Sequence, residues 1–392
     1  MGLEKVKHLV GYCLGAPDCY VRGPHNPFIK NVIPEPFRKC PSYEYFHFMS
    51  HTLRGRVDIS EKIYFHDFPV TEELVKPAWT CLGDGLCAEM CRLGPGGEWA
   101  EIIRALREEI VEKGFSPPEA NTRADDNIKR LHNVFGGKQE RREKWAEGLN
   151  LPKTGSDVFF AGCSVSFLRP EIGKAEVKVL KAAGLDVAYL GAEEWCCGLP
   201  AGWDGQTNIE EDMARHNVEA LKAAGAKRVI FDCPGCYRTF KLDYPKVVGE
   251  LPFELVHTSQ LLAESVSKMK LKNLPKKLTY HDPCHLGRHM KVYEEPRKVI
   301  TSIPGVELVE MPRNRRWAWC CGAGRGVTQR AYPEYSLSVT EERLAEAKET
   351  ADTVVTACPL CVDNLTRAAG KLKVNINVTS LPELLAEALK TD

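Results

Sequence analysis

The motif Trp195-Cys196-Cys197-Gly198 occurs a second time in this chain as Trp319-Cys320-Cys321-Gly322. A single cysteine precedes each copy and a C-x2-C pair follows it, with the spacing C-x32-CC-x35-C-x2-C and then C-x35-CC-x36-C-x2-C. The ten cysteines are Cys163, Cys196, Cys197, Cys233, Cys236, Cys284, Cys320, Cys321, Cys358 and Cys361. General core packing does not explain a doubled pattern of this kind, whereas thiolates are the soft ligands that iron–sulfur clusters require. Zinc is the alternative, because C-x2-C plus two more cysteines also forms a tetrahedral zinc site.

The composition is that of a globular protein: 392 residues, 43% hydrophobic and 27% charged. Lys plus Arg and Asp plus Glu both number 53, so no electrostatic footprint for nucleic acid is expected. We find no signal peptide and no apolar run long enough to span a membrane. A chain with C-x2-C pairs and no export signal is expected to bind metal in a reducing cytoplasm rather than form disulfides.

Strand and helix patterns alternate in both repeats. The expected strands are 157–161, 186–190, 228–231, 277–280, 306–309 and 353–356, and the expected helices are 169–183, 209–224, 297–300 and 336–349. This alternation predicts an α/β fold of two pseudo-twofold related, Rossmann-like repeats with parallel sheets. All ten cysteines follow the carboxyl ends of expected strands, where open α/β sheets bind ligands. The two sets would then face one another. Glycines beside them should let the backbone approach an inorganic core, namely Gly198, Gly235, Gly322 and Gly324.

The N-terminal third is expected to be a mainly helical iron–sulfur module, with a helix at 98–111. We place this module at 1–114 and a polar connector with one charged helix (138–148) at 115–150. The first repeat then covers 151–272 and the second 273–392.

Six further cysteines in the N-terminal third resemble a bacterial two-cluster ferredoxin, C-x2-C-x2-C-x3-C-P twice. In the second run Asp84 replaces the second cysteine, and in the first Ala16 does. Exchanging the fourth ligands, as ferredoxins do, predicts one cluster on Cys40, Cys81, Asp84 and Cys87 and another on Cys13, Cys19 and Cys91. The latter lacks a fourth thiolate, so it could hold a three-iron cluster, recruit Asp18, or be empty. One or two further [4Fe–4S] or [3Fe–4S] clusters are expected here, with zinc again the alternative.

The two repeats resemble the CCG cysteine-rich domain, on the strength of residues 281–288 (HDPCHLGR) and 319–322 (WCCG). The whole layout is similar to the D subunit of heterodisulfide reductase. That resemblance implies a noncubane [4Fe–4S] cluster on each set of five cysteines and cleavage of a disulfide between the two clusters. It also implies partner subunits carrying flavin, iron–sulfur or membrane cytochrome groups. Similar proteins also occur in complexes that reduce quinones, fumarate, sulfur compounds or aromatic thioesters.

Disulfide reduction needs two protons, and three histidines flank Cys284: His281, His285 and His289. They could donate protons, or they could hydrogen-bond cluster sulfurs or cap a helix. Arg288, Arg325 and the run 313–316 could bind an anionic group of a substrate, although the run could equally be a surface patch. No flavin or nicotinamide motif is present, so a redox partner is required. Two functions remain open: a catalytic subunit that reduces a disulfide or related thiol compound, and a non-catalytic subunit that relays electrons.

Overall fold

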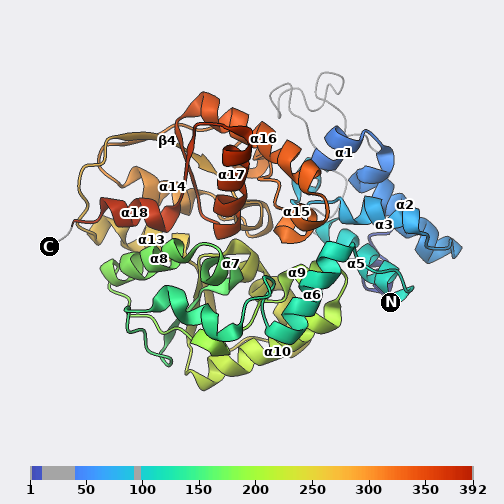
Figure 1. Cartoon of the computed structure of the whole chain (residues 1–392), viewed down its shortest axis with the longest axis horizontal. Helices are drawn as coiled ribbons and strands as arrows, with labels where there is room; N and C mark the ends of the chain where they lie inside the picture. Colours follow the sequence, from blue (N-terminus) through green and yellow to red (C-terminus); the bar gives the residue numbers. More distant parts are fainter. Residues whose placement is uncertain (1, 11–39, 92–98, 391–392) are drawn as a thin grey trace.

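The computed structural model describes residues 2–10, 40–91 and 99–390 and contains two separate parallel sheets (Figure 1). The first sheet has the order β1-β2-β3, formed by Asp157–Phe160, Arg228–Phe231 and Glu254–His257. The second has the order β5-β4-β6-β7, formed by Val306–Leu308, Lys276–His281, Thr353–Thr356 and Asn377–Ser380. Ala188 adds a single parallel bridge to Val158 on the outer side of β1. The two halves therefore share one topology, with β1 equivalent to β4 and β2 to β6.

The central strands have the apolar residues that parallel sheets covered by helices require. In β1, β2 and β6 every residue after the first is buried, as expected of strands with helices on both faces. The covering helices of the first half are α8 (Pro170–Ala182), α10 (Thr207–Ala223) and α13 (Thr258–Ser265). Those of the second half are α14 (Glu294–Thr301), α16 (Pro333–Thr350), α17 (Pro359–Leu372) and α18 (Leu381–Ala388).

Helices of the two halves pack against one another in reciprocal pairs. α8 of the first half packs against α18 of the second, and α13 of the first packs against α14 of the second (Figure 1). α13 and α18 also begin alike, each with a capping box directly after the last strand of its half. These reciprocal contacts are what a pseudo-twofold relation between the repeats requires.

The mixed α/β architecture with parallel sheets is confirmed, and most expected elements are present. The expected strand at 186–190 is wrong, because only Ala188 forms a bridge there. Two strands were not expected, β3 and β7. Both are partly exposed and carry polar residues, so they lack the apolar run of a buried strand.

The N-terminal part is helical, as expected. It contains α1 (Pro41–Phe46), α2 (Leu53–His66), α3 (Glu72–Trp79), α4 (Leu86–Met90) and α5 (Trp99–Glu112). Arg107 of α5 is almost fully buried and donates to the carbonyl oxygens of Ala78, Cys81 and Trp203. This one side chain therefore joins the N-terminal helices to the first repeat.

The segment 115–150 packs against the repeats along its length. It contains α6 (Glu119–Leu131), which was not expected, and a 3-10 helix, η6 (Gln139–Ala146), where a charged helix was expected. α6 contacts α9 (Leu199–Trp203) and α15 (Val327–Ala331), while η6 contacts α7 (Gly162–Phe167) and α8. In the part of the chain that the structure describes, no helix is both long enough and apolar enough to cross a membrane.

Candidate metal centre

The ten repeat cysteines line a single cavity of about 370 Å³ between the two halves. Cys163 lies in the first turn of α7, directly after β1, and Cys284 follows β4 at the equivalent place. Cys233 and Cys358 are the N-cap residues of α11 (Pro234–Arg238) and α17, which place Cys236 and Cys361 one turn further on. The adjacent cysteine pairs lie in the loops before α9 and before the 3-10 helix η12 (Gly324–Gly326).

The sulfurs contact one another in the same order in both halves. In the first half the order is Cys163, Cys196, Cys197, Cys236 and Cys233. In the second it is Cys284, Cys320, Cys321, Cys361 and Cys358, where the Sγ atoms of Cys361 and Cys321 are 3.2 Å apart. Cys233 also contacts Cys358, so the two sets of five meet. Ten converging soft donors are chemically suited to iron–sulfur clusters and exceed what two zinc ions need.

The glycine that follows each cysteine pair has a backbone role. Gly198 has φ 82° and Gly322 has φ 85°, a left-handed conformation that favours glycine. A Cβ at Gly198 would lie 2.9 Å from Cα of Glu210 in α10, and one at Gly322 would lie 2.5 Å from the carbonyl oxygen of Ser336 in α16. The two glycines therefore let these loops turn tightly against a helix.

The other two expected glycines differ from each other. A Cβ at Gly235 would be 3.5 Å from the Cys233 sulfur and 3.6 Å from Nδ1 of His285, so this position does give close access to the cysteines. A Cβ at Gly324 would instead meet Thr328 Oγ1 at 2.5 Å. Close approach of the backbone to a cluster remains a prediction, and Gly235 is the one of the four whose surroundings favour it.

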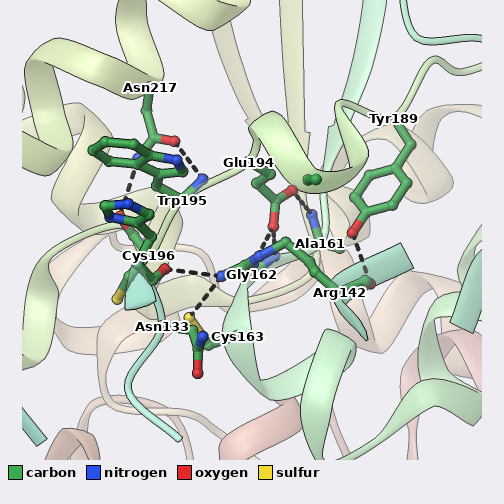
Figure 2. A network of polar contacts seen from close by, with 12 residues as sticks. Asn133, Arg142, Ala161, Gly162, Cys163, Tyr189, Glu194, Trp195, Cys196 and Asn217 are labelled. Atoms are coloured by element: carbon green, nitrogen blue, oxygen red, sulfur yellow. Dashed lines mark hydrogen bonds and ion pairs between the residues drawn. The ribbon is translucent and has the colours of Figure 1, made fainter. Parts of the chain in front are cut away.

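A buried ion pair holds the first set of cysteines (Figure 2). Arg142 and Glu194 are both fully buried, and Arg142 Nη1 donates to Glu194 Oε1 at 2.8 Å. The same carboxylate accepts from the backbone N–H groups of Ala161 and Gly162, at 2.8 and 2.9 Å. Arg142 Nη2 also lies 3.4 Å from the Cys163 sulfur, as a donor to it. The pair thus fixes both the loop and the thiol of Cys163.

A stack of three aromatic rings covers the Cys196 loop. Trp195 lies between His132 and His216, with ring centroids 3.5 Å apart on each side and nearly parallel planes. The backbone N–H of Cys196 donates to the carbonyl oxygen of His132 at 2.8 Å, and Asn217 donates to the carbonyl oxygen of Cys196 at 3.0 Å. Trp195 is thus held between two histidine rings directly beside Cys196.

His281, the last residue of β4, lies beside the second set of cysteines. Its Nδ1 accepts from Arg343 Nε at 2.9 Å, so the proton of the neutral ring is on Nε2, which contacts no hydrogen-bonding group among the described residues. A ring nitrogen of His281 and the sulfurs of Cys321 and Cys361 lie within 4.8 Å of one another. Burial lowers the pKa of His281 well below its usual value, so the ring is neutral. Among the described residues no other such grouping of three possible ligand atoms, drawn from His, Cys, Asp and Glu side chains, is found.

Of the other residues expected near Cys284, only His285 and Arg325 line the cavity. Arg288 donates to the carbonyl oxygens of Asp84, Arg316 and Ala318 and pairs with the Asp84 carboxylate at 3.1 Å. His289 Nε2 donates to the carbonyl oxygen of Gly83 at 3.0 Å. These two side chains hold the N-terminal loop between Cys81 and Cys87 and do not reach the cavity.

Arg325 supports the same loop from the cavity side. Its two Nη groups donate to the carbonyl oxygens of Leu82 and Gly83, and its guanidinium lies over the ring of Trp203 at 3.4 Å. Burial lowers the pKa of Arg325 to about 9. The run 313–316 also lies away from the cavity. Arg313 pairs with Glu342 and Glu346, and Arg315 pairs with Glu294 and Glu310.

A second, smaller cavity lies in the N-terminal part. It is lined by all four residues expected to hold one ferredoxin-like cluster: Cys40, Cys81, Asp84 and Cys87. Burial raises the pKa of Cys40 to about 12. Cys91, four residues after Cys87, is half-buried. Its two expected partners, Cys13 and Cys19, lie outside the described residues. Asp84 is engaged by Arg288, so its carboxylate is shared between this cavity and the second repeat.

Sequence reasoning missed three residues in or beside the main cavity. Arg142 and Glu194 were not predicted as a pair, because they are 52 positions apart in the sequence. Arg330 of α15 lines the cavity but belongs to no recognisable motif. A charged residue inside the polar segment 115–150 gives no signal that its side chain is buried.

Sequence comparison identifies the class of the two repeats. The family of the cysteine-rich domain, CCG, matches residues 158–241 and 278–366, which contain all ten cavity cysteines. The chain belongs to the family of the heterodisulfide reductase D subunit. It is 39% identical over 327 residues to the D subunit of the dihydromethanophenazine:CoB–CoM heterodisulfide reductase of Methanosarcina barkeri, covering 81% of this chain and 79% of that protein.

More distant relatives are also redox proteins. The B subunit of the fumarate reductase (CoM/CoB) of Methanothermobacter marburgensis is 33% identical, over 80% of this chain and 62% of that protein. EtfAB:quinone oxidoreductase of Syntrophomonas wolfei is 31% identical, over 80% of this chain but only 46% of that protein. A crystal structure of a hypothetical protein from Helicobacter pylori has the same fold, with TM-score 0.58 and 14% identity over 86% of this chain and 67% of that one. The chain is thus an iron–sulfur oxidoreductase subunit.

Proposed function

We propose that this subunit reduces a disulfide, or a related sulfur compound, in the cavity between the two sets of five cysteines. The single observation that carries the proposal is that all ten cysteines line one cavity of about 370 Å³. Two noncubane [4Fe–4S] clusters, each on one set of five, would supply one electron each and an iron site for each departing thiolate. The disulfide takes up two electrons and two protons and leaves as two thiols.

The chain's own residues have separate tasks in this reaction. Leu199, Pro200 and Leu360 line the cavity and help exclude water. His285 is the one of the three predicted proton donors that lines the cavity, and its Nε2 contacts no hydrogen-bonding group among the described residues. Burial lowers its pKa well below the usual value, so the ring is neutral and one of its nitrogens carries a single N–H. It would position a leaving thiolate by donating a hydrogen bond through that N–H, while the two protons of the product thiols come from solvent.

We further propose that electrons enter through the N-terminal part. Cys40, Cys81, Asp84 and Cys87 line one cavity and would hold a cluster there, while Cys13, Cys19 and Cys91 would hold the other. Arg288, His289 and Arg325 join this loop to the second repeat, which gives a direct structural connection between the two sites. Partner subunits with flavin, iron–sulfur or cytochrome groups would be the electron source, with the chain in the cytoplasm. The same connection favours the second candidate, a subunit that only relays electrons.

The first experiment measures iron and zinc in the anaerobically purified protein, with EPR before and after a thiol is added to the oxidised state. Iron for three or four clusters with a thiol-dependent signal supports the reductase. The same iron content without a thiol response leaves the electron relay. Zinc in the repeats contradicts both.

A further inference from the structure

Three arginines line the central cavity, and they differ in what their guanidinium groups already bind. Arg325 uses both Nη groups on the backbone of the N-terminal loop. Arg367 is exposed and lies 3.5 Å from the carboxylate of Asp363. Arg330, on α15, makes no hydrogen bond with Nε or Nη2 to any described residue, although both atoms are buried. Its nearest carboxylate oxygen, Asp204 Oδ2, is 3.8 Å away.

Arg330 also lies between the central cavity and a groove on the outside of the protein. It lines the central cavity and, together with Val134, an outer groove along α6 that carries the exposed Arg130. On the cavity side it is close enough to Cys196 to interact electrostatically. A molecule entering from the α6 groove would therefore pass Arg330 before it reached the cysteines.

Two buried carboxyl groups lie behind this arginine. Asp204 Oδ1 accepts from Trp79 Nε1 and from Asn121 Nδ2, each at 2.9 Å, while its Oδ2 has no hydrogen-bond donor among the described residues. Neither oxygen of Asp125 has a donor among them. Burial and the neighbouring acid raise the pKa of Asp125 to about 9, and burial raises that of Asp204 to about 6. Near neutral pH the pair thus carries about one negative charge, which keeps Arg330 charged without using its N–H groups.

Buried guanidinium N–H groups without acceptors are unfavourable, and a ligand oxygen would remove that penalty. We propose that Arg330 is the anion anchor of the central cavity, which binds a carboxylate, sulfonate or phosphate group of the substrate through its guanidinium group and directs the sulfur of the substrate toward the cysteines. A planar guanidinium with two free donors suits such groups. This deepens the proposed function and rests on it for the identity of the sulfur compound.

The test compares two thiols of equal length, 3-mercaptopropionate and the neutral 3-mercapto-1-propanol, by calorimetry with the anaerobic holoprotein at pH 7.5. The wild type should bind the carboxylate about tenfold more tightly, as expected for charge-assisted hydrogen bonds. R330Q should bind both thiols equally, and R330K should keep part of the preference. D204N removes a competing negative charge and should raise the affinity for the carboxylate several-fold. R215Q removes an exposed arginine outside the cavity and should leave the ratio unchanged.

Iron content and melting temperature equal to those of the wild type establish that R330Q is folded and loaded. An unchanged preference in R330Q, or no preference in the wild type, overturns the anchor. Propionate, which has no thiol, separates this proposal from the reductase. If 3-mercaptopropionate binds no more tightly than propionate and R330Q abolishes the binding of both, the anchor stands and the disulfide chemistry falls.

Discussion

The two repeats hold five cysteines in the same order, yet the groups around those cysteines differ. At the first repeat, Arg142 of a fully buried Arg142–Glu194 pair donates to Cys163, and Glu194 accepts from the loop before α7. In the second, the charges of Arg288 and Arg325 act to lower the pKa of Cys284, and both arginines are hydrogen-bonded to the N-terminal loop. One site is therefore supported by the segment 115–150 together with its own repeat, and the other depends on the N-terminal part. If electrons enter through the N-terminal part, as proposed above, the second site is the one joined to that part through Arg288 and Arg325.

Removing Glu194 should have the largest effect on stability. E194A leaves Arg142 buried without its counter-charge, which costs roughly 3–5 kcal/mol in comparable buried pairs. In the second repeat, E346Q should cost much less, because Arg343 still donates to His281 and Arg313 still pairs with Glu342. Urea unfolding, together with hydrogen exchange in β1 and β4, would measure the difference. Equal losses in the two variants would contradict the contrast between the repeats.

The pH dependence of stability should come mainly from the first repeat. Glu176 of α8 is fully buried, and burial raises its pKa from 4.5 to about 8. The native state then binds a proton that the unfolded state has released, so stability falls as pH rises from about 5 toward 8. From this group the loss should be roughly 3 kcal/mol between pH 5 and 7.5. At the equivalent place after β4 stands Arg297, which is paired with Asp282 and adds no such slope.

E176Q should therefore flatten the stability profile and be more stable than the wild type at pH 7.5. E171Q, which changes an exposed acid on the same helix, is the control and should retain the slope. Melting temperatures of the wild type and both variants, measured from pH 5 to 8, would test these two expectations. A profile of E176Q parallel to that of the wild type would show that other buried acids, Asp204 and Glu210 among them, dominate.

Alanine at the glycine after each cysteine pair should cost about 1–3 kcal/mol from the left-handed backbone and the added Cβ. G322A should be the more severe, since its Cβ would lie 2.4 Å from Thr340 Oγ1 and 2.5 Å from a backbone oxygen. In G198A the closest backbone atom would be 2.9 Å away. Thermal unfolding of both variants measures this order, and a larger loss in G198A would refute it.

Cysteine spacing and the alternation of apolar runs predicted the parallel sheets and placed all ten repeat cysteines at strand ends. This prediction succeeded because the carboxyl ends of parallel strands lie at one edge of a sheet, so residues that follow them come together there. The repeated spacing also allowed each copy to support the assignment of the other. The roles of Arg288 and His289 were not predictable in the same way. Both lie near Cys284 in sequence, but their partners are about 200 positions away in the loop at Gly83 and Asp84. Arg142 was hidden for a similar reason, since burial of a charged residue depends on tertiary contacts.

The smallest predicted effect concerns the difference in reduction potential between the two clusters that we propose for the CCG repeats. Hydrogen bonds to the sulfur ligands help to set cluster potentials, and a cationic donor favours the reduced, more negative state. R142Q weakens the donor to Cys163, so the potential of the first cluster should fall by roughly 60 mV, a tenfold change in a one-electron equilibrium. The potential of the second cluster should change much less, because Arg142 donates to Cys163, whereas the arginines that act on Cys284 are Arg288 and Arg325.

R142K keeps the charge but not the fork of donors, so it should lie between R142Q and the wild type. An EPR-monitored redox titration of the anaerobic protein measures both clusters in one sample. E194Q is the opposite test, because it removes the negative charge beside Cys163 and leaves the guanidinium in place, so it should raise the potential of the first cluster. An equal shift of both potentials in R142Q would show a long-range electrostatic effect. That result would contradict the separate support of the two sites that the contacts of Cys163 and Cys284 indicate.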